Sequence, residues 1–592
     1  MKILLITPPL LQPNTPYAAT PLLTAWLREN GHGAVQADLS LELLLKLFSK
    51  EGVATLCRTV EACAEAGEFL AAEQDYLETI EEVITFLQDR NPAASKKITK
   101  RGWLPEGPHL FHAYEQEEQL GWNFRGLDEV DRTRHLASLY LDDLAEAAKL
   151  ADPNFGFSRY AEKLATSLPR FEKLRNALES APTLFSTWLE ELTDGRMQKH
   201  TPDMVALTVP FPGCLLGALC IARRIKQTFP EVGITIGGGY VNTELRELRD
   251  PGIFDYVDHI TLDSGMLPLL QLANRATPIR TFMRENGIVR FHEDGALPIA
   301  HNALPAPVYD GLDLNRYFGL FEMLNPVTRL WSDGRWNKLM LAHGCCWRRC
   351  EFCDTSIDYI RRYDPAETAT ICDWIEAVIA QSGFNGFHFV DESLPHDLLD
   401  GLCDEILRRG LKIEWWGNIR FETRFSSALI QKMAEAGCIA VTGGLETGHD
   451  RTLKLMRKGI TVEGTTRVLE NLADAGILTH AYLMYGFPSQ TLKETLQALE
   501  TIRRLFDDGI LHSAFWHCFA LTAHSAIARN PAKYSITLKE PPPSDFARNE
   551  IPFDGHLDHD PGIIGEALRN ATYNYMHGIG FDRPVEQWMG KR

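Results

Sequence analysis

Short apolar runs alternate with longer amphipathic segments near the N-terminus, and this pattern predicts an α/β region. Strands are expected at Ile3–Ile6 and Ala34–Ala37, with a helix at Thr20–Glu29 between them. The alternation resumes later with strands and helices at Val205–Val209, Leu215–Phe229, Ile234–Ile236, Tyr256–Leu262 and Leu267–Ala273. Such alternation implies a parallel, doubly wound sheet that binds ligands at the carboxyl ends of its strands.

Residues 41–203 interrupt this pattern and are rich in Leu, Ala and Glu. Apolar residues recur at helical spacing in two stretches, Leu77, Ile80, Ile84 and Leu87, and Leu136, Tyr140, Leu144 and Ala147. We therefore expect a helical insertion packed on the sheet, in which these stripes form core contacts.

A second α/β region begins at Lys338. It offers six strand candidates at Leu339–Ala342, Gly386–Val390, Ile413–Trp416, Cys438–Thr442, Thr479–Met484 and Ala514–Phe519, with helices between them at Glu367–Gln381, Leu398–Arg409, Ser427–Gly437, Val462–Ala475 and Leu492–Phe506. Six such units predict a partial (β/α)6 barrel with its active site at the C-terminal strand ends.

These patterns divide the chain into four parts. Residues 1–275 form the Rossmann-like domain with its insertion, and residues 276–337 form a connector that holds the turn signals Asn286-Gly287 and Asp333-Gly334. Residues 338–525 form the barrel, and residues 526–592 form an irregular C-terminal tail.

Composition and charge exclude several classes of protein. The 592 residues are 45% hydrophobic and 23% charged, which is a globular composition, and the net charge of −19 disfavours binding of nucleic acid through its phosphates. No apolar run is long enough to span a membrane, and the four-residue run near the N-terminus is too short for a signal peptide. We expect a cytoplasmic protein that is not bound to a membrane.

Four of the twelve cysteines lie within nine residues. Cys346, Cys350 and Cys353 have C-x3-C-x2-C spacing after a predicted strand, and three thiolates in one loop can hold three irons of a [4Fe–4S] cluster. The fourth iron then stays open to bind a ligand. A zinc site would need a fourth ligand, which does not stand at suitable spacing, and Cys345 is expected to pack.

This motif, with the aromatic Phe352, resembles that of the radical S-adenosylmethionine (SAM) enzymes. The resemblance covers about residues 335–525 and includes Arg457-Lys458-Gly459 and Gly486-Phe487-Pro488. It implies that Glu392, after the second strand, contacts the SAM amino group, and that Glu446, in Gly443-Gly444-Leu445-Glu446-Thr447-Gly448, contacts the ribose. Arg420 either pairs with the SAM carboxylate or forms a surface ion pair.

The N-terminal region resembles the cobalamin-binding domains that precede many radical SAM modules. The resemblance rests on Thr7-Pro8-Pro9-Leu10, Pro13, Pro16 and Gly237-Gly238-Gly239. It implies that Pro9, Leu10 and Thr208 surround the corrin, while the three glycines let the backbone approach the nucleotide tail. Residues 1–280 lack Asp-x-His-x-x-Gly, and Leu262-Asp263-Ser264-Gly265-Met266 replaces the Gly-Glu-Gly-Glu of many relatives. A Rossmann-like domain with another ligand, or with none, is the alternative.

The resemblance implies a cobalamin-dependent methyltransferase acting on an unactivated carbon, with a [4Fe–4S] cluster and SAM. A cobalamin-independent radical SAM rearrangement, cyclisation or oxidation is the first alternative, and a non-catalytic iron–sulfur redox or sensor protein is the second. The expected partners are a small-molecule or peptide substrate and an electron donor such as flavodoxin or ferredoxin. A tail cluster of Asp554, His556, Asp558, His559 and Asp560 is expected to form a solvated turn rather than a metal site.

Overall fold

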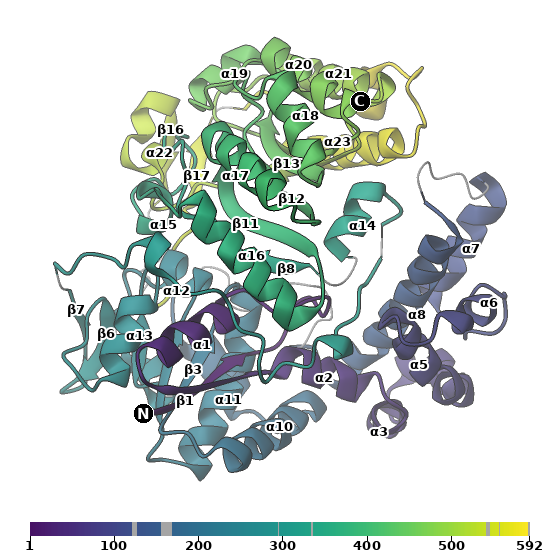
Figure 1. Cartoon of the computed structure of the whole chain (residues 1–592). Helices are drawn as coiled ribbons and strands as arrows, with labels where there is room; N and C mark the ends of the chain where they lie inside the picture. Colours follow the sequence, from purple (N-terminus) through teal and green to yellow (C-terminus); the bar gives the residue numbers. More distant parts are fainter. Residues whose placement is uncertain are drawn as a thin grey trace.

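Two parallel sheets, joined through shared core residues, form the body of the protein. The computed structural model describes residues 1–120, 127–154, 168–293, 295–321, 323–332, 336–539, 545–555 and 557–589. In Figure 1 the N-terminal sheet lies below the green barrel, and a group of blue helices lies to one side. No helix in these ranges is both long and apolar enough to cross a membrane.

The N-terminal sheet has seven strands in the order β2-β1-β3-β4-β5-β6-β7. Their bounds are Lys2–Thr7 (β1), Gly33–Asp38 (β2), Met204–Thr208 (β3), Gly233–Gly237 (β4), His259–Thr261 (β5), Thr281–Glu285 (β6) and Ile288–His292 (β7). Strands β1 to β5 are parallel, which confirms the predicted doubly wound sheet. The β6–β7 hairpin turns at Asn286-Gly287 and pairs antiparallel with β5, so part of the predicted connector extends this sheet. Asp333 and Gly334, the second turn signal, lie outside the described residues.

Helices account for all the regular structure that is described between β2 and β3. They are α2 (Leu39–Leu47), α3 (Lys50–Val60), α4 (Gly67–Ala71), α5 (Glu73–Leu87), α6 (Ser95–Ile98), α7 (Pro108–Leu120), α8 (Glu129–Ala151), α9 (Glu172–Glu179) and α10 (Leu184–His200). Leu136, Tyr140 and Leu144 of α8 are buried, as their spacing predicts.

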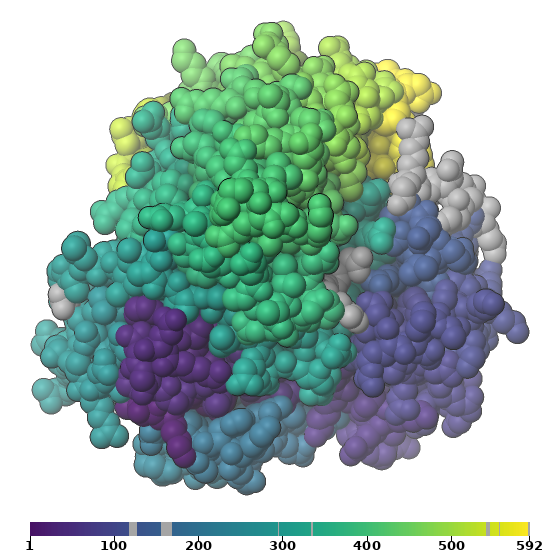
Figure 2. Space-filling model, in the orientation of Figure 1, coloured from purple at the N-terminus to yellow at the C-terminus, as the bar shows by residue number. Residues whose placement is uncertain are grey.

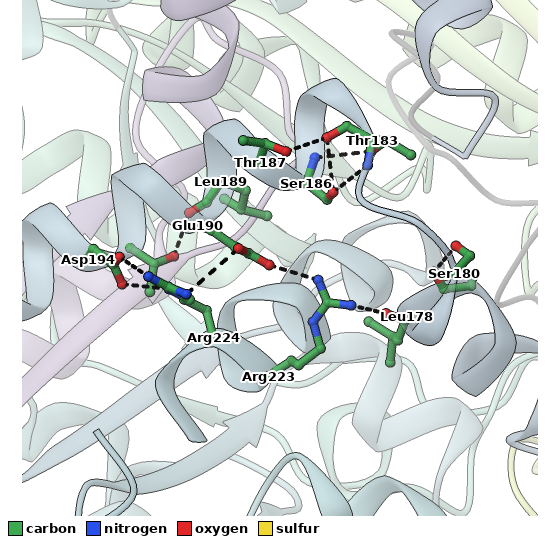
Figure 3. A network of polar contacts seen from close by, with 12 residues as sticks. Leu178, Ser180, Thr183, Ser186, Thr187, Leu189, Glu190, Asp194, Arg223 and Arg224 are labelled. Atoms are coloured by element: carbon green, nitrogen blue, oxygen red, sulfur yellow. Dashed lines mark hydrogen bonds and ion pairs between the residues drawn. The ribbon is translucent and has the colours of Figure 1, made fainter. Parts of the chain in front are cut away.

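Four helices flank the sheet itself: α1 (Ala19–Glu29), α11 (Leu215–Thr228), α12 (Gly239–Glu244) and α13 (Met266–Ala273). Helix α10 ties the insertion to α11 through ion pairs, which Figure 3 shows from close by. Glu190 lies 2.9 Å from Arg223, and Asp194 lies 2.8 Å from Arg224. The insertion is therefore fixed to the sheet domain at its last helix.

The second sheet has six parallel strands in the order β15-β14-β13-β12-β11-β8, as a partial barrel requires. Their bounds are Asn337–Leu339 (β8), Gly386–Leu394 (β11), Glu414–Ile419 (β12), Cys438–Glu446 (β13), Leu478–Tyr485 (β14) and Ser513–Cys518 (β15). The helices between them are α15 (Asp358–Arg361), α16 (Thr368–Ser382), α17 (His396–Arg409), α18 (Ser427–Glu435), α19 (Asp450–Leu455), α20 (Val462–Asp474) and α21 (Leu492–Asp507). Helix α14 (Pro326–Ser332) precedes the barrel and contacts β14.

The first barrel strand ends earlier than the predicted Leu339–Ala342. It stops at Leu339, and Ala342–His343 forms a separate short strand, β9, that pairs with β10 (Asp364–Pro365). The cause is the buried carboxylate of Asp391, which accepts hydrogen bonds from the backbone N–H groups of Leu341 and Ala342. These groups are thereby diverted from a strand ladder.

The C-terminal tail is more regular than the sequence predicts. It contains α22 (Ala526–Arg529), the antiparallel pair β16 (Ile536–Leu538) and β17 (Phe553–Gly555), and the long helix α23 (Pro561–Met576). Helix α23 packs on β15, where the indole of Trp516 donates to Thr572 at 2.8 Å. Ala567, Leu568 and Ala571 are buried in this contact, and their helical spacing could have predicted it.

The two sheets share an interface. Trp26 of α1 and Met266 of α13 belong to the same hydrophobic cluster as the barrel residues, and the Trp26 indole donates to the Met266 carbonyl. Gln36 of β2 donates to the carbonyl of Val308 at 2.7 Å. The space-filling view shows the purple N-terminal segment in direct contact with the barrel side (Figure 2).

Candidate functional site

The loop that carries the cysteine motif leaves β9 through Gly344. This glycine has φ +81°, and a Cβ atom here would overlap the carbonyl oxygen of Arg362. Farther along, the backbone N–H of Glu351 donates to Met456, and that of Ile527 donates to Glu351. The loop is thus held by segments that follow the fourth and sixth barrel strands.

The three predicted iron ligands lie along this loop. The thiols of Cys350 and Cys353 lie within hydrogen-bonding distance, and this contact, with burial opposing and the cations Lys458 and Arg420 assisting, lowers the pKa of Cys350. The Cys346 sulfur lies 3.8 Å from Ser393 Oγ and is also hydrogen-bonded to Cys345. Three thiols on one loop beside cationic side chains fit a [4Fe–4S] cluster, because thiolates are its ligands. Across the described ranges no three His, Cys, Asp or Glu side chains already form a single-ion site.

A cavity of about 310 Å³ opens beside the cysteines, and we call it the SAM-side cavity. It brings together most of the residues that the sequence analysis placed in the cluster and SAM site. Its lining includes Cys350, Cys353, Glu392, Asn418, Arg420, Gly444, Glu446, Lys458 and Tyr482. These residues come from the loop and from the ends of four neighbouring strands, as expected for a barrel active site.

Glu392 faces this cavity with no hydrogen-bond or ion-pair partner from the described part of the chain. Burial, assisted by the negative charge of Cys345, raises its pKa to about 7. One residue earlier along β11, Asp391 points the other way and accepts hydrogen bonds from the backbone N–H groups of Leu341 and Ala342. Glu392 is therefore free to receive a ligand cation.

Arg420 is buried and its guanidinium lies over the ring of Trp347, 4.1 Å from the centroid. It also donates to the carbonyl oxygen of Lys458. Arg420 also forms an ion pair with Glu422, at 3.8 Å between Nε and the carboxylate, but this pair is largely buried rather than on the surface. Arg420 therefore braces the cysteine loop from inside the site.

Glu446 is already paired. Its carboxylate lies 2.6 Å from the ammonium of Lys458, and both side chains are buried. Burial alone would lower the pKa of Lys458, but Glu446 and the Cys350 sulfur raise it. In the sequence analysis Lys458 appears only as part of Arg457-Lys458-Gly459, and no feature of the neighbouring sequence indicates its ion pair with Glu446.

The residues predicted for cobalamin are spread along the edge of the N-terminal sheet. A Cβ on Gly238, which has φ +118°, would lie 2.7 Å from the carbonyl oxygen of Val209, and one on Gly239 would lie 2.7 Å from that of Pro210. A Cβ on Gly237 would meet Thr261 Oγ1 at 2.8 Å. These contacts give a packing reason for glycine at all three positions, and their part in a nucleotide-tail site stays a prediction.

Pro9, Leu10 and Thr208 also lie among protein atoms. Thr208 is buried, Leu10 borders two small voids of about 20 Å³ each, and Pro9 packs against Gly217. The next residues of the same loop, Leu11 and Gln12, instead line a much larger space between the two sheets.

This second space, the interface cavity, has a volume of about 500 Å³. Leu11, Asp38, Phe211 and Ser264 line it from the carboxyl edge of the N-terminal sheet. Lining residues from the connector and barrel include His301, Leu304, Lys338, Met340, Trp374, His388 and Val390. Its volume falls within the range of about 300–1,000 Å³ that is usual for ligand pockets, and its location follows the rule for parallel sheets.

The acidic tail cluster does not form a metal site within the described residues. Asp554 pairs with Lys539 at 2.8 Å, and Asp558 accepts from the backbone of Leu492. Asp560 caps helix α23 by accepting from Gly562 and Ile563. His556 lies outside the described residues.

Comparisons with known proteins agree with the barrel site. The model of the radical SAM superfamily matches residues 340–502. An uncharacterized methyltransferase of Pyrococcus horikoshii is 24% identical over 52% of this chain and 66% of its own length. The anaerobic magnesium-protoporphyrin IX monomethyl ester cyclase of Rubrivivax gelatinosus is 26% identical over 53% of this chain and 56% of its own length. The matched part thus spans between half and two thirds of these relatives.

Solved structures with a related outline were also found. The cobalamin-dependent SAM radical enzyme OxsB, with aqua-cobalamin and SAM bound, aligns over 64% of this chain and 59% of its own, with 15% identity and a TM-score of 0.49. The radical SAM methyltransferase TsrM of Kitasatospora setae aligns over 68% of this chain and 81% of its own, with 17% identity and a TM-score of 0.45.

Proposed function

Because this chain is a radical SAM enzyme with a doubly wound sheet in front of its barrel, we propose that it methylates an unactivated carbon and uses cobalamin as the methyl carrier. The observation that carries the proposal is the interface cavity, in which the strand ends of the sheet face the inside of the barrel. The methyltransferase name of the Pyrococcus horikoshii relative supports it.

The residues of the SAM-side cavity have separate tasks in this scheme. Cys346, Cys350 and Cys353 would hold three irons, and the cluster with SAM supplies reductive cleavage of the SAM C–S bond. Glu392, which has no partner among the described residues, would accept hydrogen bonds from the SAM ammonium. Glu446, held in place by Lys458, presents its carboxylate to the ribose hydroxyls.

The protein must also keep water from the reacting carbon. The interface cavity is lined mostly by apolar side chains, among them Leu304, Met340 and Trp374. A dry cavity protects a substrate radical from side reactions and orients the carbon that reacts.

The structure bears differently on the two parts of cobalamin, the corrin ring and the nucleotide tail. Leu11, Phe211 and Ser264 at the sheet edge would contact a corrin ring, and bound cobalamin supplies the transferable methyl group. At Gly238 protein backbone already lies against one side of the loop that would approach the tail. This contact favours, as a second candidate, a cobalamin-independent radical SAM rearrangement, cyclisation or oxidation.

The proposed protein partner is an electron donor such as flavodoxin or ferredoxin. Arg348, Arg349, Arg361 and Arg457 are exposed around the cysteine loop, although the chain as a whole is strongly acidic. This local positive charge suits an acidic one-electron donor that must approach the cluster.

Anaerobic reconstitution with iron, sulfide and cobalamin tests the proposal. The protein is then reduced and incubated with SAM and candidate substrates. We expect mass spectrometry to detect S-adenosylhomocysteine, 5′-deoxyadenosine and a methylated product. Formation of 5′-deoxyadenosine with no retained cobalamin would favour the second candidate, and absence of SAM cleavage in cluster-loaded protein would contradict both.

A further inference from the structure

Two nitrogen-bearing side chains line the interface cavity next to each other. Lys338 of β8 and His388 of β11 are paired in register on adjacent parallel strands, so both face the barrel interior. Both belong to the lining of the interface cavity. The sequence analysis named neither residue as a candidate. Lys338 directly precedes the predicted strand Leu339–Ala342, and His388 lies within the predicted strand Gly386–Val390.

The ammonium of Lys338 has no hydrogen-bond or ion-pair partner within the described part of the chain. Asp38, also on the cavity lining, acts on it only through space. The oxygens of Asp38 are engaged elsewhere, by the backbone N–H of Leu41 at 2.9 Å and the hydroxyl of Tyr317 at 2.9 Å. Burial lowers the pKa of Lys338 to about 8, so at neutral pH most molecules carry this charge without a contacting partner from the described residues.

His388 is fixed in orientation by its neighbour. Its ring stacks on Trp416 with the centroids 3.5 Å apart and the planes 9° apart. Burial and the charge of Lys338 hold the pKa of His388 well below its usual range, so the ring is neutral and offers one N–H donor. No described residue accepts that hydrogen bond.

The rest of the cavity is largely apolar and leads toward the SAM-side cavity. Leu22, Leu23 and Met266 lie on the wall that belongs to the N-terminal domain. On β11, Val390 lines the interface cavity, and Glu392, on the same face of the strand, lines the SAM-side cavity. A ligand anchored at Lys338 therefore extends along β11 toward the site of SAM.

We propose that the interface cavity binds the substrate as an apolar molecule with a carboxylate or phosphate group, and that this anion lies between Lys338 and His388. The ammonium supplies the charge, the imidazole supplies a neutral donor, and the apolar walls hold the carbon skeleton with one end toward Glu392. A buried cation without a partner is costly, and an anionic ligand removes that cost. The assignment of the ligand as substrate rests on the proposed function, whereas the anion site itself does not.

The test compares three probes with the same alkyl chain, octanoate, octyl phosphate and octanol, by titration of the cluster-loaded protein monitored by ligand NMR. We expect an anion to bind roughly tenfold to a hundredfold more tightly than octanol, as a charge-assisted hydrogen bond allows. Whichever of octanoate and octyl phosphate binds more tightly identifies carboxylate or phosphate as the group that the site recognises. Lys338→Met should remove this preference, and Lys338→Arg should keep most of it.

The exposed Lys412 provides the matched control, since Lys412→Met removes the same charge outside the cavity and should change nothing. Equal binding of octanol and both anions by the parent protein would overturn the proposal. So would a Lys338→Met variant that keeps the preference for the anion. Octanoate binding needs neither reduction nor SAM cleavage, so a failure of the proposed function would leave this result readable.

Discussion

Replacing Asp391 by alanine should loosen the entry to the cysteine loop, although Asp391 is not a predicted ligand. Its carboxylate accepts hydrogen bonds from the backbone N–H groups of Leu341 at 3.0 Å and Ala342 at 2.7 Å, just before the loop. Alanine leaves both buried donors without an acceptor. At about 1–3 kcal/mol for each unsatisfied group, the expected loss of stability is about 2–6 kcal/mol.

The substitution Asp391→Asn distinguishes the effect of the hydrogen bonds from the effect of the charge. The Asp391 oxygen Oδ1 lies within reach of both N–H groups, so an amide oxygen in its place keeps both bonds. Burial raises the pKa of Asp391 to about 7, which means that the folded state favours its neutral form. Asp391→Asn should therefore cost much less than Asp391→Ala.

The sign of the pH effect follows from the same shift. Because the folded pKa lies above the unfolded value of 3.8, the stability that this group contributes is greatest at low pH and is lost as the pH rises toward about 7. An amide does not titrate, so Asp391→Asn should gain stability relative to the parent protein between about pH 4 and pH 7.

Hydrogen exchange of peptides that cover residues 339–345, together with urea denaturation and iron content, measures these effects. Asp373→Ala is the matched control, because that exposed carboxylate forms only a surface pair with Arg409 and should matter little. Unchanged exchange and stability in Asp391→Ala would refute the role assigned to this carboxylate.

Three further outcomes test the site. Cys350→Ala should abolish the cluster while Cys345→Ala keeps most of its iron, and iron and sulfide analysis showing the reverse would mean that the wrong cysteines were chosen. Gly344→Ala should lower cluster content without removing a ligand, because its backbone is left-handed and its side chain would overlap Arg362, and a normal cluster absorption spectrum would contradict this. Glu446→Gln should retain the cluster but bind SAM roughly tenfold to a hundredfold more weakly in titration, and unchanged affinity would make Glu446 structural.

The order of strands and helices in both regions could be predicted because it depends on local patterns of hydrophobic residues. Apolar runs such as Ile3–Ile6 become buried strands, and amphipathic segments such as residues 492–507 become helices on a sheet face. Both sheets are confirmed with the predicted parallel pairing, apart from the β6–β7 hairpin. The C-terminal strand ends then place Glu392 and Glu446 at one cavity.

The contacts between residues that shape the site could not be predicted. The residues in each contact are far apart in the sequence, and they meet only because neighbouring strands pair in a particular alignment. Lys338 meets His388 only because β8 pairs with β11 in one particular alignment. Asp391 reaches the backbone of Leu341 because the same alignment pairs Phe389 with Leu339, two residues earlier on each strand. The glycines at 237–239 were ambiguous for another reason, since glycine equally permits the approach of a ligand or of protein backbone.

Helix α23 has a consequence for the integrity of the barrel. An open six-stranded sheet has two exposed margins, and unpaired strand backbone at a margin can recruit strands of other molecules. The N-terminal domain lies against the barrel near β8, and α23 packs on β15 at the opposite margin. The tail therefore covers part of the last barrel strand, and a chain cut after residue 525 should aggregate more readily because β15 would lose this cover.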